Sequence, residues 1–85
     1  MLSQDLIDRI NRAIADEFEA DPATFTPATD LGKDLGLDSL DSVDLIASME
    51  RTFKIKVPEA EARGLRTLGD IYTFIEKLLA QKPAG

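Results

Sequence analysis

Apolar residues recur at helical spacing in the first 18 residues of the chain. They are Leu6, Ile7, Ile10, Ile14 and Phe18. With about 3.6 residues per turn, this spacing gathers them on one face of a helix, and the charged residues between them fall on the remaining surface. The pattern therefore predicts an amphipathic helix over residues 4–18.

A long segment without helical periodicity, residues 20–37, follows this helix. Pro22 and Pro27 disfavour helix at the residue before each of them, and Gly32 and Gly36 interrupt the segment further on. Loops of this length without secondary structure are uncommon in compact domains and are often functional. We therefore expect a functional site nearby. Four apolar residues are expected to hold the loop against the core: Phe25, Leu31, Leu35 and Leu37.

Asp38 and Asp41 mark the start of a second predicted helix. An acidic residue three positions after an N-cap aspartate is a variant of the capping box, so Ser39 becomes the first helical residue, and the helix runs to about Phe53. On a helical wheel the inward side carries Val43, Ile46, Met49 and Phe53, and the outward side carries Asp41, Asp44 and Ser48, with Leu40 and Ala47 at its edge. The outward face is therefore acidic with an apolar margin.

The rest of the chain predicts two further helices. The segment KIKVP, residues 54–58, breaks the helical period, and a short helix follows between Pro58 and Gly64. Thr67 and Asp70 cap a last helix, whose apolar residues are Ile71, Phe74, Ile75, Leu78 and Leu79. Residues 81–85, QKPAG, are expected to fray. The alternating stretch FKIKV has no second strand to pair with, so the predicted fold class is an all-α bundle.

Composition narrows the function classes. At 85 residues, of which 44% are hydrophobic, the chain is expected to form a single domain over residues 1–85. It contains no cysteine and no histidine, so disulfides, thiol nucleophiles, serine–histidine triads and histidine-ligated metals are all excluded. We therefore expect a protein that is not an enzyme. No window approaches the roughly 18 apolar residues of a membrane span and the first residues lack the marks of a signal peptide, so a cytoplasmic location is expected.

The charge of the chain is negative and unevenly distributed. The net charge is −6; residues 1–50 carry 12 acidic and 3 basic side chains, whereas residues 51–85 carry 4 acidic and 7 basic ones. Nucleic-acid binding requires clustered basic residues, so this balance argues against it and favours a basic partner. The acidic half contains the start of the second helix.

Two kinds of chemistry at the aspartate-rich stretch DLGKDLGLDSLD are disfavoured. Counted from Asp30 or from Asp34 as the first ligand of a calcium loop, a glycine falls where an oxygen ligand is needed, and Leu35 or Ser39 falls where glycine is needed. A nucleophilic Ser39 lacks a histidine base, and the nearest lysine in sequence, Lys33, lies beside Asp34. A calcium site and a serine hydrolase are therefore both poor interpretations.

The triplet Asp38-Ser39-Leu40 at a helix start resembles the phosphopantetheine attachment motif of the acyl carrier protein family. The resemblance extends through DLGLDSLDSVDLIASMERTF, through IKVPEAEA as the short third helix, and through LRTLGDIYTFI as the fourth, so it covers nearly all of residues 1–80. It implies a four-helix bundle with a long loop between the first two helices. The triplet alone is a weak signal, but its place after a long loop in an acidic chain of this length is specific.

The resemblance also implies a function and a site. A phosphopantetheinyl transferase would attach the 4′-phosphopantetheine of coenzyme A to Ser39, with Asp38 and Leu40 beside it, and the resulting thiol would carry acyl groups as thioesters for fatty acid, polyketide or related biosynthesis. The implied partners are this transferase and acyl-loading, condensing and acyl-transfer enzymes with basic docking patches; the carrier itself is expected to be a monomer. The expected docking residues are Asp41, Asp44, Ala47, Ser48 and Arg51. The expected acyl-chain pocket residues are Met49, Phe53, Val57, Leu65, Leu68 and Ile71.

Two alternatives remain at this point: a peptidyl or aminoacyl carrier, and an unmodified acidic helical module in which Ser39 merely starts a helix. One departure from the family pattern is also evident. Carriers of general fatty acid synthesis tend to continue the acidic run past the second helix, whereas here Arg51, Lys54 and Lys56 follow Glu50. This departure favours a specialised carrier whose partners differ from those of the carrier of general fatty acid synthesis.

Overall fold

The computed structural model describes residues 3–81 of the chain, and the fold within this range is helical. Its elements are α1 (Gln4–Phe18), a 3₁₀ turn η1 (Pro22–Thr24), α2 (Ser39–Phe53), α3 (Glu59–Ala62) and α4 (Leu68–Gln81). No strand occurs between residues 3 and 81, apart from a single antiparallel bridge between Asp30 and Thr67. The prediction of an all-α bundle with a short third helix is confirmed. None of the helices described is long and apolar enough to cross a membrane.

Side chains near the helix starts explain where α1 and α4 begin. The Ser3 hydroxyl accepts a hydrogen bond from the Leu6 N–H, which is the usual N-cap arrangement. At α4 the Asp70 carboxylate accepts from the Thr67 N–H, and the Thr67 hydroxyl accepts from the Asp70 N–H, as the sequence predicts. The Asp70 carboxylate also accepts from the Arg66 N–H at 3.1 Å, and the Arg66 and Thr67 N–H groups together hold the pKa of Asp70 below its ordinary value.

The predicted frayed tail is wrong at its first residue. Gln81 still belongs to α4, and the other four residues of that tail, 82–85, lie outside the described range.

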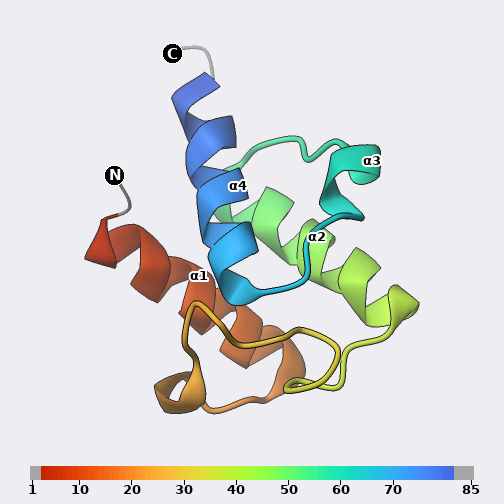
Figure 1. Ribbon diagram of the computed structural model, residues 1–85. Coiled ribbons are helices and arrows are strands. Elements are labelled where there is room, and N and C mark those ends of the chain that lie inside the picture. Colours follow the sequence, from red (N-terminus) through yellow and green to blue (C-terminus); the bar gives the residue numbers. More distant parts are fainter. Residues whose placement is uncertain (1–2, 82–85) are drawn as a thin grey trace.

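The core lies between α1, α2 and α4, which cross one another as Figure 1 shows. Its buried residues are Ile10, Ile14, Leu31, Leu45, Met49, Phe53, Leu68, Ile71, Tyr72 and Ile75. Tyr72, which the apolar pattern did not include, is fully buried and donates a hydrogen bond from its hydroxyl to Asn11 Oδ1 of α1. Burial raises the pKa of Tyr72, because the phenolate would lose its hydration.

The buried face of α2 differs from the predicted one. Leu45 and Ser48 are buried beside Met49 and Phe53, whereas Val43, which was expected to face inward, is 60% exposed. The reason is that α2 has apolar residues on two sides, one packed into the core and the other turned away from it. A helical wheel merges these two sides into one stripe.

The long loop between α1 and α2 is held by the start of α4. Three backbone hydrogen bonds join them: Leu31 N–H to Arg66 C=O at 2.8 Å, Leu68 N–H to Thr29 C=O at 3.0 Å, and Gly69 N–H to Pro27 C=O at 2.8 Å. Leu31 enters the core, and Phe25, Leu35 and Leu37 pack against it, so the predicted apolar anchors of the loop are confirmed. Figure 1 shows this loop, in orange and yellow, crossing the end of the bundle where α4 begins.

Glycine is required at position 69 by this close approach. A Cβ atom at Gly69 would lie 2.9 Å from the Pro27 carbonyl oxygen, closer than carbon and oxygen atoms can pack without displacement. At Gly64, by contrast, a Cβ atom would lie 3.7 Å from the nearest atom, the Glu61 carbonyl oxygen, which is ordinary van der Waals contact.

Gly69→Ala is therefore expected to lower the free energy of unfolding by about 1–3 kcal/mol, because the added methyl group pushes the loop away from α4. Gly64→Ala is the matched control and is expected to leave stability unchanged or slightly raised. Urea denaturation followed by circular dichroism measures both. Equal stability of the two variants would show that the loop is not held in this way.

Candidate functional site

The start of α2 is capped by Asp38 rather than by a serine. Asp38 Oδ1 accepts a hydrogen bond from the Asp41 N–H at 2.9 Å, and Asp41 Oδ2 accepts one from the Asp38 N–H at 3.2 Å. Both halves of the predicted capping box are thus present, and Ser39 is the first residue of the helix. The Ser42 hydroxyl donates to the Asp38 carbonyl at 3.1 Å and closes the same turn.

The Ser39 hydroxyl is left available by this arrangement. Ser39 is exposed, and among residues 3–81 the structure gives its hydroxyl no hydrogen-bond partner. The N–H groups of Ser39 and Leu40 lie in the first turn of the helix and so have no intrahelical acceptor. The site therefore presents a free hydroxyl next to backbone donors at the positive end of a helix dipole.

The loop that leads into α2 is shaped by its own aspartates. Asp30 Oδ1 accepts from the N–H groups of Gly32 and Lys33, and Asp34 Oδ2 accepts from the Asp30 N–H. The Lys33 N–H contributes most to keeping the pKa of Asp30 below its ordinary value. Gly36 then adopts φ +69°, a left-handed conformation that glycine takes without strain. The aspartate-rich stretch thus forms the turns that deliver the chain to Ser39.

A cleft of about 730 Å³ lies between α2 and α3, and Ser39 is part of its lining. Its apolar lining comes from Val43, Ile46 and Ala47 on α2 and from Val57, Ala62 and Leu65 in and around α3. Its polar lining comes from Ser39, Ser42, Glu50, Glu59 and Arg63. The second apolar side of α2 therefore faces this cleft and not the core.

Glu50 positions α3 against α2. Glu50 Oε2 accepts a hydrogen bond from the Val57 N–H at 2.9 Å, across the connection between the two helices. Lys54 begins that connection in the left-handed conformation, with φ 54°, and Pro58 starts α3. This carboxylate thus fixes the connection against α2. It thereby holds Val57 in the position where it lines the cleft.

The predicted pocket residues divide between the cleft and the core. Val57 and Leu65 line the cleft. Met49, Phe53, Leu68 and Ile71 are instead buried in the core between α1, α2 and α4. The sequence pattern could not separate the two groups, because both consist of apolar residues at helical spacing.

The predicted docking residues also lie in different environments. Asp44 is exposed, Asp41 is partly exposed within the capping box, and Ala47 lines the cleft. Ser48 was expected on the outer face but is only 5% exposed, so its inclusion was wrong: it faces the core. Leu40 and Val43, at 75% and 60% exposure, are the large hydrophobic residues exposed within residues 3–81, and they flank Asp41 and Asp44 on α2.

Arg51, the remaining docking candidate, is engaged with α1. Its guanidinium lies 3.2 Å from Glu17 Oε1, and the two side chains are 70% and 31% exposed. An exposed ion pair of this kind contributes about 0–1 kcal/mol, so it positions Arg51 without holding it firmly. Arg51 is therefore at the α1 side of α2, away from the cleft side chains.

Sequence reasoning missed Glu50, Glu59 and Arg63 as cleft residues. The only available signal was the short connection between α2 and α3, residues 54–58, which keeps the two helices close together.

The chain is similar to known proteins over most of its length. A family model described as "Phosphopantetheine attachment site" matches residues 8–75. The chain is 44% identical to an acyl carrier protein of Amoebophilus asiaticus over 69 residues, which are 81% of this chain and 86% of that protein. It is 34% identical to an acyl carrier protein of Thermosynechococcus vestitus over 80 residues, covering 94% of this chain and 99% of that one. A solved structure from Mycobacterium tuberculosis, classed as an acyl carrier protein, superposes with a TM-score of 0.79 at 32% identity, covering 85% of this chain and 96% of that one.

Asp38→Ala is expected to lower the free energy of unfolding by about 1 kcal/mol, because the Asp41 N–H loses its acceptor. Asp38→Asn is the control: it keeps a side-chain oxygen at the cap and is expected to lose only a few tenths of a kcal/mol. Urea denaturation measures both variants. A loss of the same size in Asp38→Asn would assign the effect to charge instead of capping.

Proposed function

The chain belongs to the acyl carrier protein family, and from this premise we propose that Ser39 is the residue to which its 4′-phosphopantetheine is attached. Proteins of this family carry acyl groups on that covalent prosthetic group and are not themselves catalysts. The observation that supports Ser39 most directly is that a different residue caps the start of α2. Asp38 caps the helix, so the exposed Ser39 hydroxyl has no structural task.

The residues around Ser39 fit this group. The free N–H groups of the first turn and the helix dipole favour a phosphate there, and the cleft beside Ser39 offers an apolar surface to the arm and its cargo. When attached, the group supplies a thiol that forms thioesters. The chain has no thiol of its own, because it contains no cysteine. Of the predicted pocket residues, Val57 and Leu65 are the ones we propose to contact the cargo.

Ser39→Ala is expected to abolish modification, whereas Ser42→Ala is expected to leave it intact. Ser42 is the matched control, because it is exposed on the same helix and lines the same cleft. Each protein is incubated with coenzyme A, Mg²⁺ and a promiscuous phosphopantetheinyl transferase, and its intact mass is measured. Wild type and Ser42→Ala should gain one phosphopantetheine. A gain on Ser39→Ala would overturn the assignment, and no gain on folded wild type would favour the unmodified interaction module.

The family also implies that the protein interacts with a phosphopantetheinyl transferase and with enzymes of acyl biosynthesis. We propose that these partners dock on the exposed face of α2 formed by Leu40, Asp41, Val43 and Asp44. Alternating apolar and acidic side chains favour a partner patch that is basic with an apolar centre. Charge complementarity of this kind raises the association rate without requiring tight binding, which suits a carrier that must leave each enzyme.

Asp44→Asn is expected to lower kcat/KM of the transferase about two- to fivefold at low salt, the effect of losing one exposed ion pair worth up to about 1 kcal/mol. Asp16→Asn, on the exposed surface of α1, is the control and should have no effect. Raising the salt concentration should remove the difference.

Glu17→Gln releases Arg51 from α1. If neither it nor Arg51→Gln changed kcat/KM, Arg51 would not belong to the docking face of the transferase.

The finer assignment is a carrier of fatty acid or polyketide type, monomeric and cytoplasmic, with partners of its own. The fatty acid or polyketide type is favoured by the sequence Gly36-Leu37-Asp38-Ser39-Leu40, which lacks a second glycine before the aspartate, and the partners of its own are favoured by Arg51, Lys54 and Lys56 in place of the usual acidic run after Glu50. All three side chains are exposed. Arg51 lies in the last turn of α2, whereas Lys54 and Lys56 lie beyond its end. A partner with a uniformly basic patch would be repelled there, which favours enzymes whose patches also carry acidic groups.

A further inference from the structure

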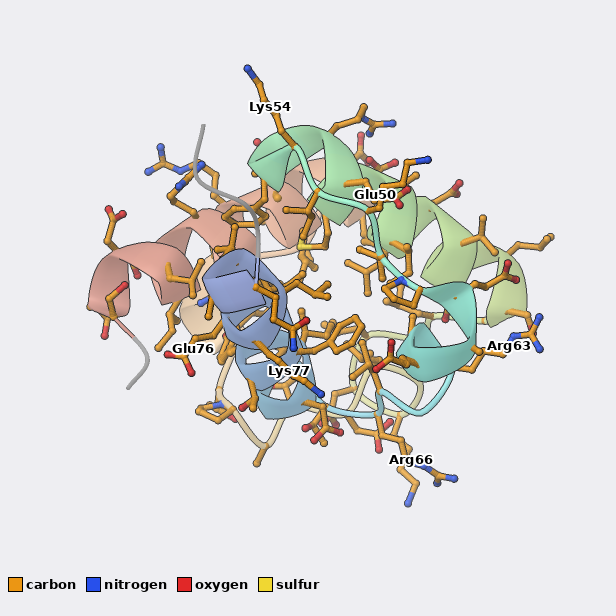
Figure 2. All side chains as sticks on the ribbon, turned by 90° about the horizontal axis from the view of Figure 1, so that it is seen from above. Glu50, Lys54, Arg63, Arg66, Glu76 and Lys77 are labelled. Carbon is orange, nitrogen blue, oxygen red and sulfur yellow. The ribbon has the colours of Figure 1, made fainter. Side chains whose placement is uncertain are left out.

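The cleft beside Ser39 contains one basic side chain. Among the described residues that line it, Arg63 is the only lysine or arginine, and it follows directly after α3. In Figure 2, Arg63 lies on the side of α3 where α2 begins, whereas Arg66 points away from α2. Arg63 thus differs from the other basic residues between positions 51 and 81 in sharing a cleft with Ser39.

The guanidinium of Arg63 is only weakly engaged. Its Nη2 atom lies 3.1 Å from Glu59 Oε1, one helical turn earlier, and the two side chains are 77% and 75% exposed. Exposed pairs at this spacing stabilise a helix very little, so a stronger acceptor can replace Glu59 with little loss. Arginine is also suited to bind a phosphate, because its planar group donates two parallel hydrogen bonds.

The surroundings of Ser39 are otherwise acidic. Asp38 and Asp41 both have their carboxylates in the first turn of α2, and exposed Asp44 follows one turn later. A phosphodiester on Ser39 adds another negative charge to this group. The helix N-terminus offsets part of the repulsion, but the Asp41 N–H is already taken by Asp38. A nearby cation would offset the repulsion that remains.

We propose that Arg63 is the counter-ion of the phosphodiester on Ser39 and holds the start of the arm at the mouth of the cleft. This inference rests on the proposed attachment at Ser39. The ligand chemistry is an oxyanion on the arm, and two sources exist: the phosphodiester itself or a carboxylate at the end of the cargo. The phosphodiester is favoured because its bond to Ser39 keeps it next to the acidic cluster whatever the cargo is.

The experiment compares holo wild type, Arg63→Gln and Arg66→Gln by ³¹P NMR at low salt. Arg66→Gln is the matched control, because it removes the same charge from an exposed arginine that does not line the cleft. The phosphodiester resonance is expected to shift in Arg63→Gln and to stay at the wild-type position in Arg66→Gln. Added salt should move the wild-type resonance towards that of Arg63→Gln, because screening weakens the pair.

A second readout separates the two sources of the oxyanion. The Arg63 Nε–Hε signal is recorded in the apo protein, in the holo protein, and in proteins loaded with succinyl or butyryl phosphopantetheine. A displacement already present on going from apo to holo supports the phosphodiester. A displacement seen only with succinyl would overturn the proposal in favour of a cargo carboxylate, and identical ³¹P positions in wild type and Arg63→Gln would overturn it altogether.

Intact mass, measured on every sample, distinguishes the two levels of failure. If wild type is not modified at Ser39, the proposed function fails and this inference falls with it. If wild type is modified but Arg63 does not respond, the function stands and only the counter-ion is refuted.

Discussion

The position of Ser39 depends on three backbone hydrogen bonds between the long first loop and the start of α4. Without them, the loop of residues 20–37 would be a flexible connection, and the start of α2 would not have a fixed place against the bundle. The bond from Gly69 to Pro27 is the most demanding, because the two backbones approach too closely for any side chain at position 69. Leu31, buried beside these bonds, couples the loop to the core. The start of the last helix thus holds a site that lies at the end of a long loop.

The two apolar sides of α2 have different roles, one in the core and one in the cleft beside Ser39. Leu45, Met49 and Phe53 anchor the helix in the core, and Val43, Ile46 and Ala47 form one wall of the cleft. Glu50 then sets the opposite wall by accepting the Val57 N–H. A single helix therefore displays the attachment serine, supports the core and offers an apolar surface to an acyl chain.

Local patterns in the sequence were sufficient for much of the fold. The capping boxes at Asp38 and at Thr67, the end of α2 at Phe53 and the apolar anchors of the loop all agree with the structure. The caps and the end of α2 depend on residues within a few positions of one another, and the anchors of the loop follow from their apolar side chains. The errors arose where apolar character was taken for burial, as at Val43, or polar character for exposure, as at Ser48. Position on a helix wheel does not say which neighbouring helix a face meets.

The sequence by itself determined the helices, their caps, the acidic start of α2 and the Asp-Ser-Leu motif, because short-range spacing and side-chain chemistry are sufficient to specify them. Only the tertiary structure decided which side of α2 is buried, where the cleft lies and which charged residues border it. Arg63 and Ser39 are 24 positions apart in the chain and share the cleft only because α3 packs against α2. Contacts of this kind depend on how helices meet in space, and no local pattern encodes them.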